Sequence, residues 1–117
     1  MGWNDFRLPA CGERHDNEDG TSRQAELALL TPGDELHLIR EPMNEHDPMA
    51  VAIFTSRGIR VGYLARVRAI WIGSKMDRGQ PVNAIVERVK GAALPGSPLG
   101  LVMRLNMDGE EPELPSA

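Results

Sequence analysis

Two short apolar stretches, residues 50–55 (AVAIFT) and 59–64 (IRVGYL), are separated by only the three residues Ser-Arg-Gly. β-branched and other apolar side chains dominate the first stretch, as in a central strand. In the second, apolar residues occupy alternate positions from Ile59 to Tyr63, the two-residue period of a strand. Because so short a connection joins neighbouring strands as an antiparallel hairpin, we expect the chain to build part of its fold from antiparallel pairs.

The rest of the chain repeats this arrangement of short segments separated by Gly, Pro and polar turns. A chain of 117 residues is long enough for one modest core. We therefore predict a mainly β fold: a small barrel of five or six strands, mostly antiparallel and of the OB or SH3-like kind, with one or two short helices. The domain is expected to span residues 6–106, followed by a disordered acidic tail at 107–117. The other strands are expected at 5–13, 35–41, 81–89 and 99–107, and the helices at 22–30 and 65–77.

The longer expected helix, at residues 65–77, is predicted from its apolar periodicity. Val67, Ile70 and Trp71 are spaced i, i+3 and i+4, which places them on one face of an amphipathic helix. We expect this face to pack on the core and the helix to end near Gly79.

The charges are unevenly distributed along the chain, whose formal net charge is −4. Residues 1–55 carry 4 basic and 11 acidic side chains, whereas residues 56–90 carry 8 basic and 2 acidic ones. A basic segment inside an acidic chain suits phosphate binding, because binding responds to the local field more than to the net charge. The alternative is that these side chains only solvate exposed strand and helix faces.

The chain has no run of about 18 apolar residues, so no membrane-spanning helix is expected. Its N-terminus lacks the basic and apolar segments of a secretory signal. The lone Cys11 excludes an internal disulfide and a multi-cysteine zinc site, and its place in an apolar strand predicts a small buried side chain. We therefore expect a cytoplasmic protein with no membrane partner.

His-Asp dipeptides at residues 15–16 and 46–47, together with His37, raise the question of a metal site. Metal phosphohydrolases with such a pair carry it on helices, whereas Pro48 disfavours a helical conformation at Asp47. The sequence also has no Gly-x-Ser-x-Gly turn and no phosphate-binding glycine loop. We expect no catalytic residue, no metal site and no cofactor, and hence no enzyme.

The connection at residues 40–51 (REPMNEHDPMAV) holds more polar groups than a turn needs. Asn44 and Asp47 could simply close the loop backbone, and this alternative stays open. Downstream, Tyr63 and Arg66 stand where a strand runs into a helix. A ring beside arginines suits single-stranded nucleic acid, because the ring can stack on bases and the guanidinium groups can bind phosphates.

Residues 33–66 (GDELHLIREPMNEHDPMAVAIFTSRGIRVGYLAR) resemble the HIRAN domain pattern. That pattern runs from a Gly-initiated strand through Glu-Pro-x-Asn-x-x-Asp-x-x-Ala-Val to a short hairpin and Val-Gly-Tyr-Leu. The resemblance implies a small β-barrel related to the oligonucleotide-binding folds. From a DNA-binding member of the family, it also implies recognition of single-stranded DNA at its free 3′-hydroxyl end.

The resemblance assigns roles to residues of the loop and of its neighbouring segments. Asp47 matches the acid that accepts a hydrogen bond from the terminal hydroxyl, and Asn44 matches the residue that contacts the end nucleotide. Arg14 and Arg66 match phosphate ligands.

The chain departs from the DNA-binding member at several of these positions. His15 and His46 stand where that member has stacking tyrosines, and Tyr63 stands where it has a histidine. Met43 replaces an asparagine. An imidazole can also stack on a base, with less contact area than a phenol ring, so both histidines are retained as candidates.

We therefore expect a non-catalytic module that binds the 3′ end of single-stranded DNA in DNA repair or processing, beside a helicase or nuclease partner. A protein-interaction adaptor on the same fold is the alternative. A metal-dependent hydrolase that uses the His-Asp pairs is a third.

Overall fold

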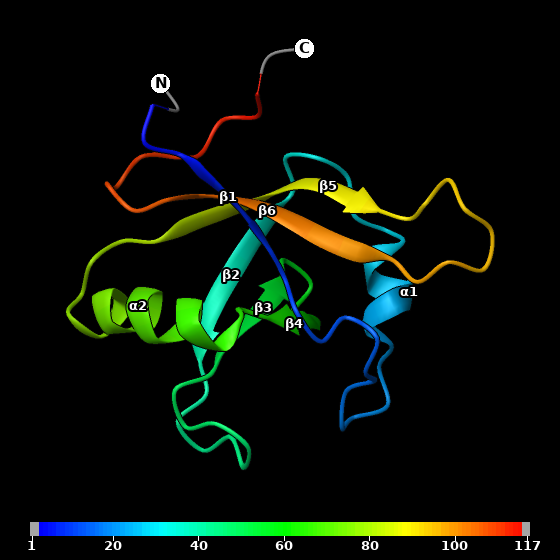
Figure 1. Ribbon diagram of the computed structural model, residues 1–117, viewed down its shortest axis with the longest axis horizontal. Helices are drawn as coiled ribbons and strands as arrows, with labels where there is room; N and C mark the ends of the chain where they lie inside the picture. The colour runs from blue at the N-terminus through cyan, green and yellow to red at the C-terminus, as the bar shows by residue number, and fades with distance from the viewer. Residues whose placement is uncertain (1–2, 116–117) are drawn as a thin grey trace.

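The computed structural model describes residues 3–115 as one strongly curved sheet with two helices (Figure 1). The strands are β1 (Phe6–Pro9), β2 (Glu35–Arg40), β3 (Val51–Thr55), β4 (Arg60–Tyr63), β5 (Asn83–Lys90) and β6 (Gly100–Asn106), and the helices are α1 (Arg23–Leu27) and α2 (Arg66–Asp77). The strand order is β1-β6-β5-β2-β3-β4, with every neighbouring pair antiparallel. This architecture confirms the predicted fold class. Neither helix within residues 3–115 is long and apolar enough to cross a membrane.

The two edges of this sheet, β1 and β4, are joined just beyond the end of β1. Cys11 and Tyr63 exchange both of their backbone hydrogen bonds, with N···O distances of 2.8 and 2.9 Å. A Cβ atom at Gly62 would lie 2.8 Å from the carbonyl oxygen of Cys11, so the close approach of the two backbones depends on glycine. Elsewhere in the sheet, β2 and β5 pair over only two residues each. Two backbone hydrogen bonds just before β2, from Gly33 to Val86 and from Val86 to Asp34, continue this pairing. The sheet is thus a partial barrel that is closed at the Cys11–Tyr63 seam.

Apolar side chains from the strands and from both helices pack together as one core. The short helix α1 begins after Ser22, whose hydroxyl oxygen accepts a hydrogen bond from the Ala25 amide at 3.1 Å. It delivers the fully buried Leu27 to the core, a burial worth about 2 kcal/mol. The buried core residues are Leu8, Leu27, Leu36, Val51, Ile53, Val61, Leu64, Ala69, Ile72, Ala84, Val86, Leu101, Met103 and Leu105.

α2 packs on the sheet with a different face from the one that the spacing predicted. Val67, Ile70 and Trp71 are 74%, 50% and 43% exposed, so the expectation that they face the core is wrong. The Trp71 ring lies beside Phe6 on β1, with 5.9 Å between the ring centroids. The helix ends close to Gly79, as predicted.

Two small residues, Ala69 and Gly73, decide which face of α2 meets the sheet. Ala69, Ile72 and Gly73 are buried, and they repeat the i, i+3, i+4 spacing of the bulkier set. A Cβ atom at Gly73 would overlap the guanidinium of Arg40 on β2. The helix can therefore approach β2 closely on its small-residue side, and its bulky apolar side is left facing outward.

Cys11 is exposed, so the expectation of a buried thiol is wrong. β1 ends at Pro9, and Cys11 follows outside the regular strand, where its backbone forms the seam with Tyr63. Although the residue is exposed, desolvation of its sulfur by neighbouring atoms, and then the nearby carboxylate of Glu13, raise the pKa of the thiol. Both effects disfavour the reactive thiolate.

Part of the expected tail lies against the strand ends. The Asp5 carboxylate accepts a hydrogen bond from the Glu113 amide at 2.8 Å, and the Asn83 side chain donates one to the Glu110 carbonyl at 2.9 Å. The expected boundary after residue 106 and the disorder of the tail stay predictions, and residues 116–117 lie outside the described part of the chain.

Replacing Gly62 with alanine tests the seam. The new Cβ would meet the Cys11 carbonyl oxygen, which the backbone holds in place, so the seam must open or shift. We expect Gly62→Ala to lower the free energy of unfolding by about 1–3 kcal/mol, measured by urea denaturation. Gly100→Ala is the matched control, because its Cβ would meet only side-chain atoms of Lys90 and Glu13, at 3.3 Å or more. Equal destabilisation by the two variants would contradict the role of the seam.

Candidate nucleic-acid interface

The loop at residues 41–50 is braced by its own side chains. The side-chain oxygen of Asn44 accepts hydrogen bonds from the amides of His46 and Asp47, at 2.9 and 3.0 Å. The Asp47 carboxylate accepts one from the Met49 amide at 2.9 Å. Bonds of this kind are how Asn and Asp close turns. Asn44 and one of the two carboxylate oxygens of Asp47 therefore hold the loop backbone in its closed conformation.

Arg40 anchors the same loop to α2. Its guanidinium donates a hydrogen bond to the Met49 carbonyl at 2.5 Å and two to the Asp77 carboxylate, at 2.8 and 3.1 Å. The loop itself projects from the lower edge of the fold in the view of Figure 1. The contacts of Arg40 thus fix the position where this projecting polar loop joins the fold.

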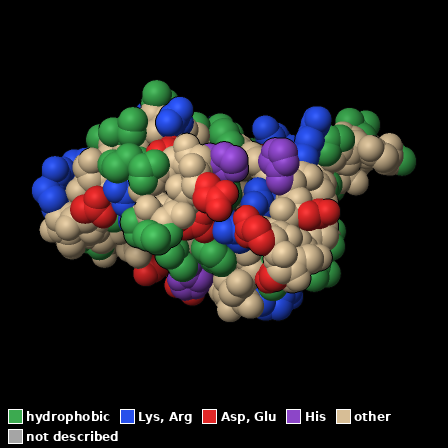
Figure 2. Space-filling view, turned by 90° about the horizontal axis from the view of Figure 1, so that it is seen from below, with side chains coloured by type: hydrophobic (Ala, Val, Ile, Leu, Met, Phe, Trp, Pro, Cys, Tyr) green, Lys and Arg blue, Asp and Glu red, His purple; other side chains and the backbone are tan. Residues whose placement is uncertain are grey.

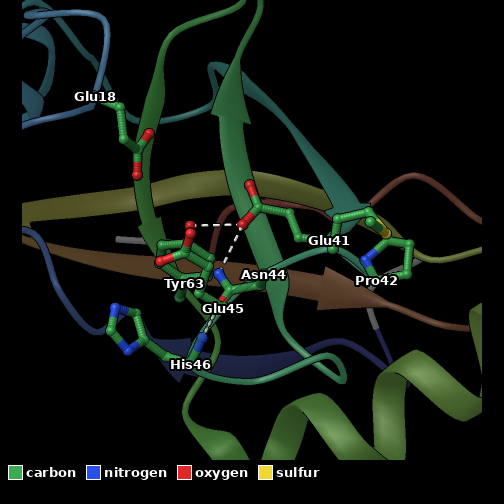
Figure 3. Close-up of a pocket in the computed structure, with 8 residues that line it drawn as sticks. Glu18, Glu41, Pro42, Asn44, Glu45, His46 and Tyr63 are labelled. Carbon is green, nitrogen blue, oxygen red and sulfur yellow. Dashed lines mark hydrogen bonds between the residues drawn. The ribbon is translucent and has the colours of Figure 1, made fainter.

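Tyr63 lies at the centre of a polar cluster beside this loop (Figure 3). Its hydroxyl donates a hydrogen bond to the Glu41 carboxylate at 2.6 Å, and the Asn44 side chain donates another to the same oxygen at 3.1 Å. The guanidinium carbons of Arg23 and Arg60 lie 5.4 and 5.5 Å from the centroid of the Tyr63 ring, within cation–π range. The ring is held at its hydroxyl by one carboxylate and is flanked by two cations.

Asn17 links the two arginines beside Tyr63. Its side-chain oxygen accepts hydrogen bonds from Nε of Arg23 at 2.7 Å and from Nε of Arg60 at 3.1 Å. Arg60 also bonds the Glu41 carboxylate at 2.8 Å, and Arg23 bonds the Gly12 carbonyl at 2.7 Å. Asn17 and Arg23 are buried. The network therefore joins three distant segments of the chain where solvent competes little for its hydrogen bonds.

These contacts shift the pKa values of Tyr63 and Glu41 in opposite directions. Burial, followed by the hydrogen bond to Glu41 and the charge of that carboxylate, raises the pKa of Tyr63 to about 12. Burial alone would raise the pKa of Glu41, but hydrogen bonds from Tyr63, Asn44 and Arg60 outweigh it and lower that pKa. At neutral pH the site therefore holds a neutral phenol against an ionised carboxylate.

Two hollows that share several lining residues open beside this cluster. One, of about 420 Å³, lies between the loop at 41–50 and the segment that follows β1, and the other, of about 450 Å³, lies against the loop itself. Figure 2 shows acidic, basic and histidine side chains close together on the surface seen from below. The first hollow brings together six of the predicted site residues: His15, Asn44, His46, Asp47, Tyr63 and Arg66.

Arg14 does not line the first hollow. It lies beside a separate hollow of about 450 Å³, which Lys90 and Pro98 also line, between the segment after β1 and the connection from β5 to β6. The structure thus groups six of the seven candidates and sets Arg14 apart, while the binding roles of all seven stay predictions.

The first hollow has a mixed charge. Asp47 and Arg66 face each other there, with 3.5 Å between a carboxylate oxygen and Nε, and the Arg66 side chain is 75% exposed. Asp16 and Glu18 line the same hollow. The candidate interface is therefore not a continuous basic groove of the kind that follows a phosphate backbone.

The fold also neutralises part of the basic segment at residues 56–90. Arg57 binds the Glu26 carboxylate at 2.9 Å, and Arg60 binds that of Glu41 at 2.8 Å. Of the basic residues in this segment, Arg66 is the one that lines the first hollow within the described chain. The electrostatic contribution of the segment to this site is thus limited mainly to Arg66.

Among residues 3–115, no group of three or more His, Cys, Asp or Glu side chains is arranged to hold a metal ion. His15 and His46 line the first hollow, whereas His37 on β2 lines another one, near β5. The His-Asp pairs and His37 therefore do not converge on one ion site.

Sequence reasoning did not identify Asn17, Arg23, Glu41 or Arg60 as parts of the site. Arg23 has the character of an ordinary helix former, and Arg60 that of an outward-facing strand residue. A signal existed for Glu41, which is the glutamate of the Glu-Pro-x-Asn pattern.

Comparison with known proteins places the chain among related domains. No curated protein sequence matches it. A family model described as the HIRAN domain matches residues 17–99. The chain is similar to a crystal structure of a protein from Lactobacillus plantarum, with a TM-score of 0.61 and 25% identity over 87% of this chain and 98% of that one. It is also similar to the crystal structure of the HIRAN domain of human HLTF, with a TM-score of 0.63 and 19% identity over 91% of this chain and 78% of that one.

Tyr63 is the single tyrosine of the chain, so the ultraviolet absorbance of tyrosinate reports on it alone. We expect the folded protein to titrate at about pH 12, and Glu41→Gln at a lower pH, because the variant loses a carboxylate that favours the neutral phenol. The pKa of Tyr63 is higher in the folded than in the unfolded chain, so the neutral phenol contributes to the stability of the fold. This contribution is complete below about pH 10 and is lost as the pH rises towards 12.

Glu45→Gln is the matched control for this titration, because Glu45 lines the same hollow as Glu41 and is exposed. It should leave the titration of Tyr63 unchanged. A midpoint near pH 10 in the native protein, or equal midpoints in the two variants, would contradict the Tyr63–Glu41 contact.

Proposed function

Because the chain belongs to the HIRAN domain family, whose members are known as DNA-binding modules, we propose that it binds single-stranded DNA at a free 3′-hydroxyl end and has no catalytic role. The observation that carries this proposal is the position of the Asp47 carboxylate. One carboxylate oxygen is used within the loop by the Met49 amide, and the other faces Arg66 at the first hollow. A hydrogen-bond acceptor, the Asp47 carboxylate, and a cation, the Arg66 guanidinium, thus lie side by side at the first hollow.

The chemistry of Asp47 suits the end of a strand. A carboxylate can only accept hydrogen bonds, and a free 3′-hydroxyl can donate one. A strand that continued past this point would bring a phosphate against the carboxylate, and Asp16 on the same hollow would add to the repulsion. Glu18 also lines the hollow, but its carboxylate is paired with the guanidinium of Arg60. The site therefore selects a strand end because its acids repel the phosphate of a strand that continues. Arg66 beside them would bind the last phosphate of the strand.

The proposed contacts to the bases come from two sides of the hollow. His15 follows β1 and His46 lies in the loop at 41–50, and both are exposed. We assign their imidazoles to stacking on the terminal bases. Tyr63 is half-buried with its hydroxyl engaged by Glu41, so we assign it to the wall of the site and not to a mobile stacking group. In this proposal Asn44 contacts the end nucleotide and also shapes the loop.

Arg14 is assigned to a phosphate further along the strand. It is exposed beside Lys90 at the neighbouring hollow, which gives that surface two cations. A module that binds an end serves a process that creates or consumes 3′ ends. We accordingly place the protein in DNA repair or processing, beside a helicase or nuclease that performs the catalysis.

Two strands that differ only at the 3′ end test this proposal. A strand ending in a 3′-hydroxyl should bind at least about tenfold more tightly than the same strand ending in a 3′-phosphate, a difference of roughly 1.4 kcal/mol. The measurement is fluorescence anisotropy at one fixed low salt concentration, because salt weakens the arginine contacts. Equal affinities for the two ends would refute end recognition and favour the adaptor alternative.

Asp47→Asn locates this selectivity at one side chain. The amide keeps an oxygen for the Met49 amide, so the loop should keep its shape. Because the negative charge is lost, the variant should bind the phosphorylated strand more tightly. The difference in affinity between the two strands should therefore become smaller. An unchanged difference would mean that Asp47 does not meet the strand end.

The salt dependence of binding tests the contact of Arg66 with phosphate. Each phosphate that the protein neutralises should contribute about −0.7 to the slope of log K against log salt. Arg66→Ala should reduce the slope by about one such contact. Arg88→Ala is the matched control, because Arg88 is an exposed arginine on β5 that lines neither hollow beside Tyr63. If both variants change the slope equally, the strand is not held at Arg66.

A further inference from the structure

The outer face of α2 carries an apolar surface that neither the core nor the proposed DNA site uses. Val67, Ile70 and Trp71, here called the α2 crest, are 74%, 50% and 43% exposed. The Trp71 ring is partly covered by Phe6, whereas Val67 and Ile70 project without an apolar cover. Three large apolar side chains in consecutive turns of one helix form a patch of the kind that marks an interaction site.

Basic residues lie near the crest, on α2 and at its C-terminal cap. Arg68 and Arg78 are exposed and Lys75 is partly exposed, and none of the three takes part in the ion pairs of residues 3–115. The helix carries one acidic residue, Asp77, and the guanidinium of Arg40 already binds it at 2.8 Å. The exposed side chains of α2 near the crest therefore carry positive charge that no unpaired acid on the helix offsets.

We propose that the α2 crest binds an acidic amphipathic segment of a partner protein. Apolar side chains of such a segment would cover Val67, Ile70 and Trp71, and its carboxylates would face Arg68, Lys75 and Arg78. This charge complementarity selects the occupant. A second copy of the chain would bring the same cations against one another, which opposes self-association through this face.

The chemistry of the crest also distinguishes a protein segment from a nucleic acid. Bases stack on aromatic rings, and two of the three crest side chains, Val67 and Ile70, are aliphatic. The one ring, Trp71, already lies against Phe6. Aliphatic side chains are instead covered well by the leucines of an amphipathic helix.

A synthetic peptide serves as the probe. It carries leucines at i, i+3, i+4 and i+7 and glutamates at most other positions, and its scrambled form has the same composition and charge. Backbone amide shifts of the full chain are followed by NMR as each peptide is added. We expect saturable shifts in α2 and at Phe6 with the amphipathic peptide, and weaker, non-saturating shifts with the scrambled one.

Two glutamate substitutions at exposed aliphatic residues separate the crest from the general surface. Ile70→Glu should weaken the binding of the amphipathic peptide at least about fivefold. Leu94→Glu, in the connection from β5 to β6, should leave it unchanged, because Leu94 is 64% exposed and lies outside α2. Neither variant should change the affinity for a single strand with a 3′-hydroxyl, so this test is independent of the proposed DNA site.

Four results would overturn the proposal. The first two are that the amphipathic peptide causes no saturable shifts in α2, or that the scrambled peptide causes equal shifts. The third is that an oligonucleotide or anionic lipid vesicles, and not the peptide, shift the crest amides. The fourth is that Ile70→Glu and Leu94→Glu weaken peptide binding equally. Crest shifts with an oligonucleotide would show that α2 extends the DNA-binding surface. Crest shifts with vesicles would show that it binds a membrane surface.

Discussion

The two backbone hydrogen bonds between Cys11 and Tyr63 connect the first and last strands of the sheet order. Without them β1 and β4 would be open edges. The seam also sets the site, because it brings the segment after β1, with His15, beside the end of β4 and the loop at 41–50. Gly62 permits this approach, since any side chain there would meet the Cys11 carbonyl. The contact that closes the fold is therefore also the contact that assembles the candidate interface.

A polar network then fixes the surfaces that the seam brings together. Arg60 reaches both Asn17 and Glu41, and Glu41 holds the hydroxyl of Tyr63. Much of the acidic charge near the site thus has a structural role, because it satisfies buried or half-buried arginines. Asp47 differs from these acids, since one of its oxygens faces the hollow beside an exposed arginine. Because of this difference, we assign the recognition of a strand end to Asp47 and the support of the site to Glu41.

The features that sequence predicted well are those with local causes. A three-residue connection forces a hairpin, and the Asx chemistry of Asn44 closes a loop wherever the loop lies. The face of α2 was predicted wrongly because α2 contains two sets with the same spacing, and close packing against Arg40 favours the smaller set, which includes Gly73. The contact of Arg23 with the Tyr63 ring could not be predicted, because the two residues are 40 positions apart in the sequence and only the folded sheet brings them together.

We propose that a strand end binds where the seam, the loop at 41–50 and the start of α2 meet. The most direct test follows the backbone amides of the whole chain by NMR while a short single strand with a 3′-hydroxyl is added. We expect the largest saturable shifts in residues 12–18, 44–47 and 63–66. Shifts concentrated on β5 or on the α2 crest, with those three segments unchanged, would contradict it.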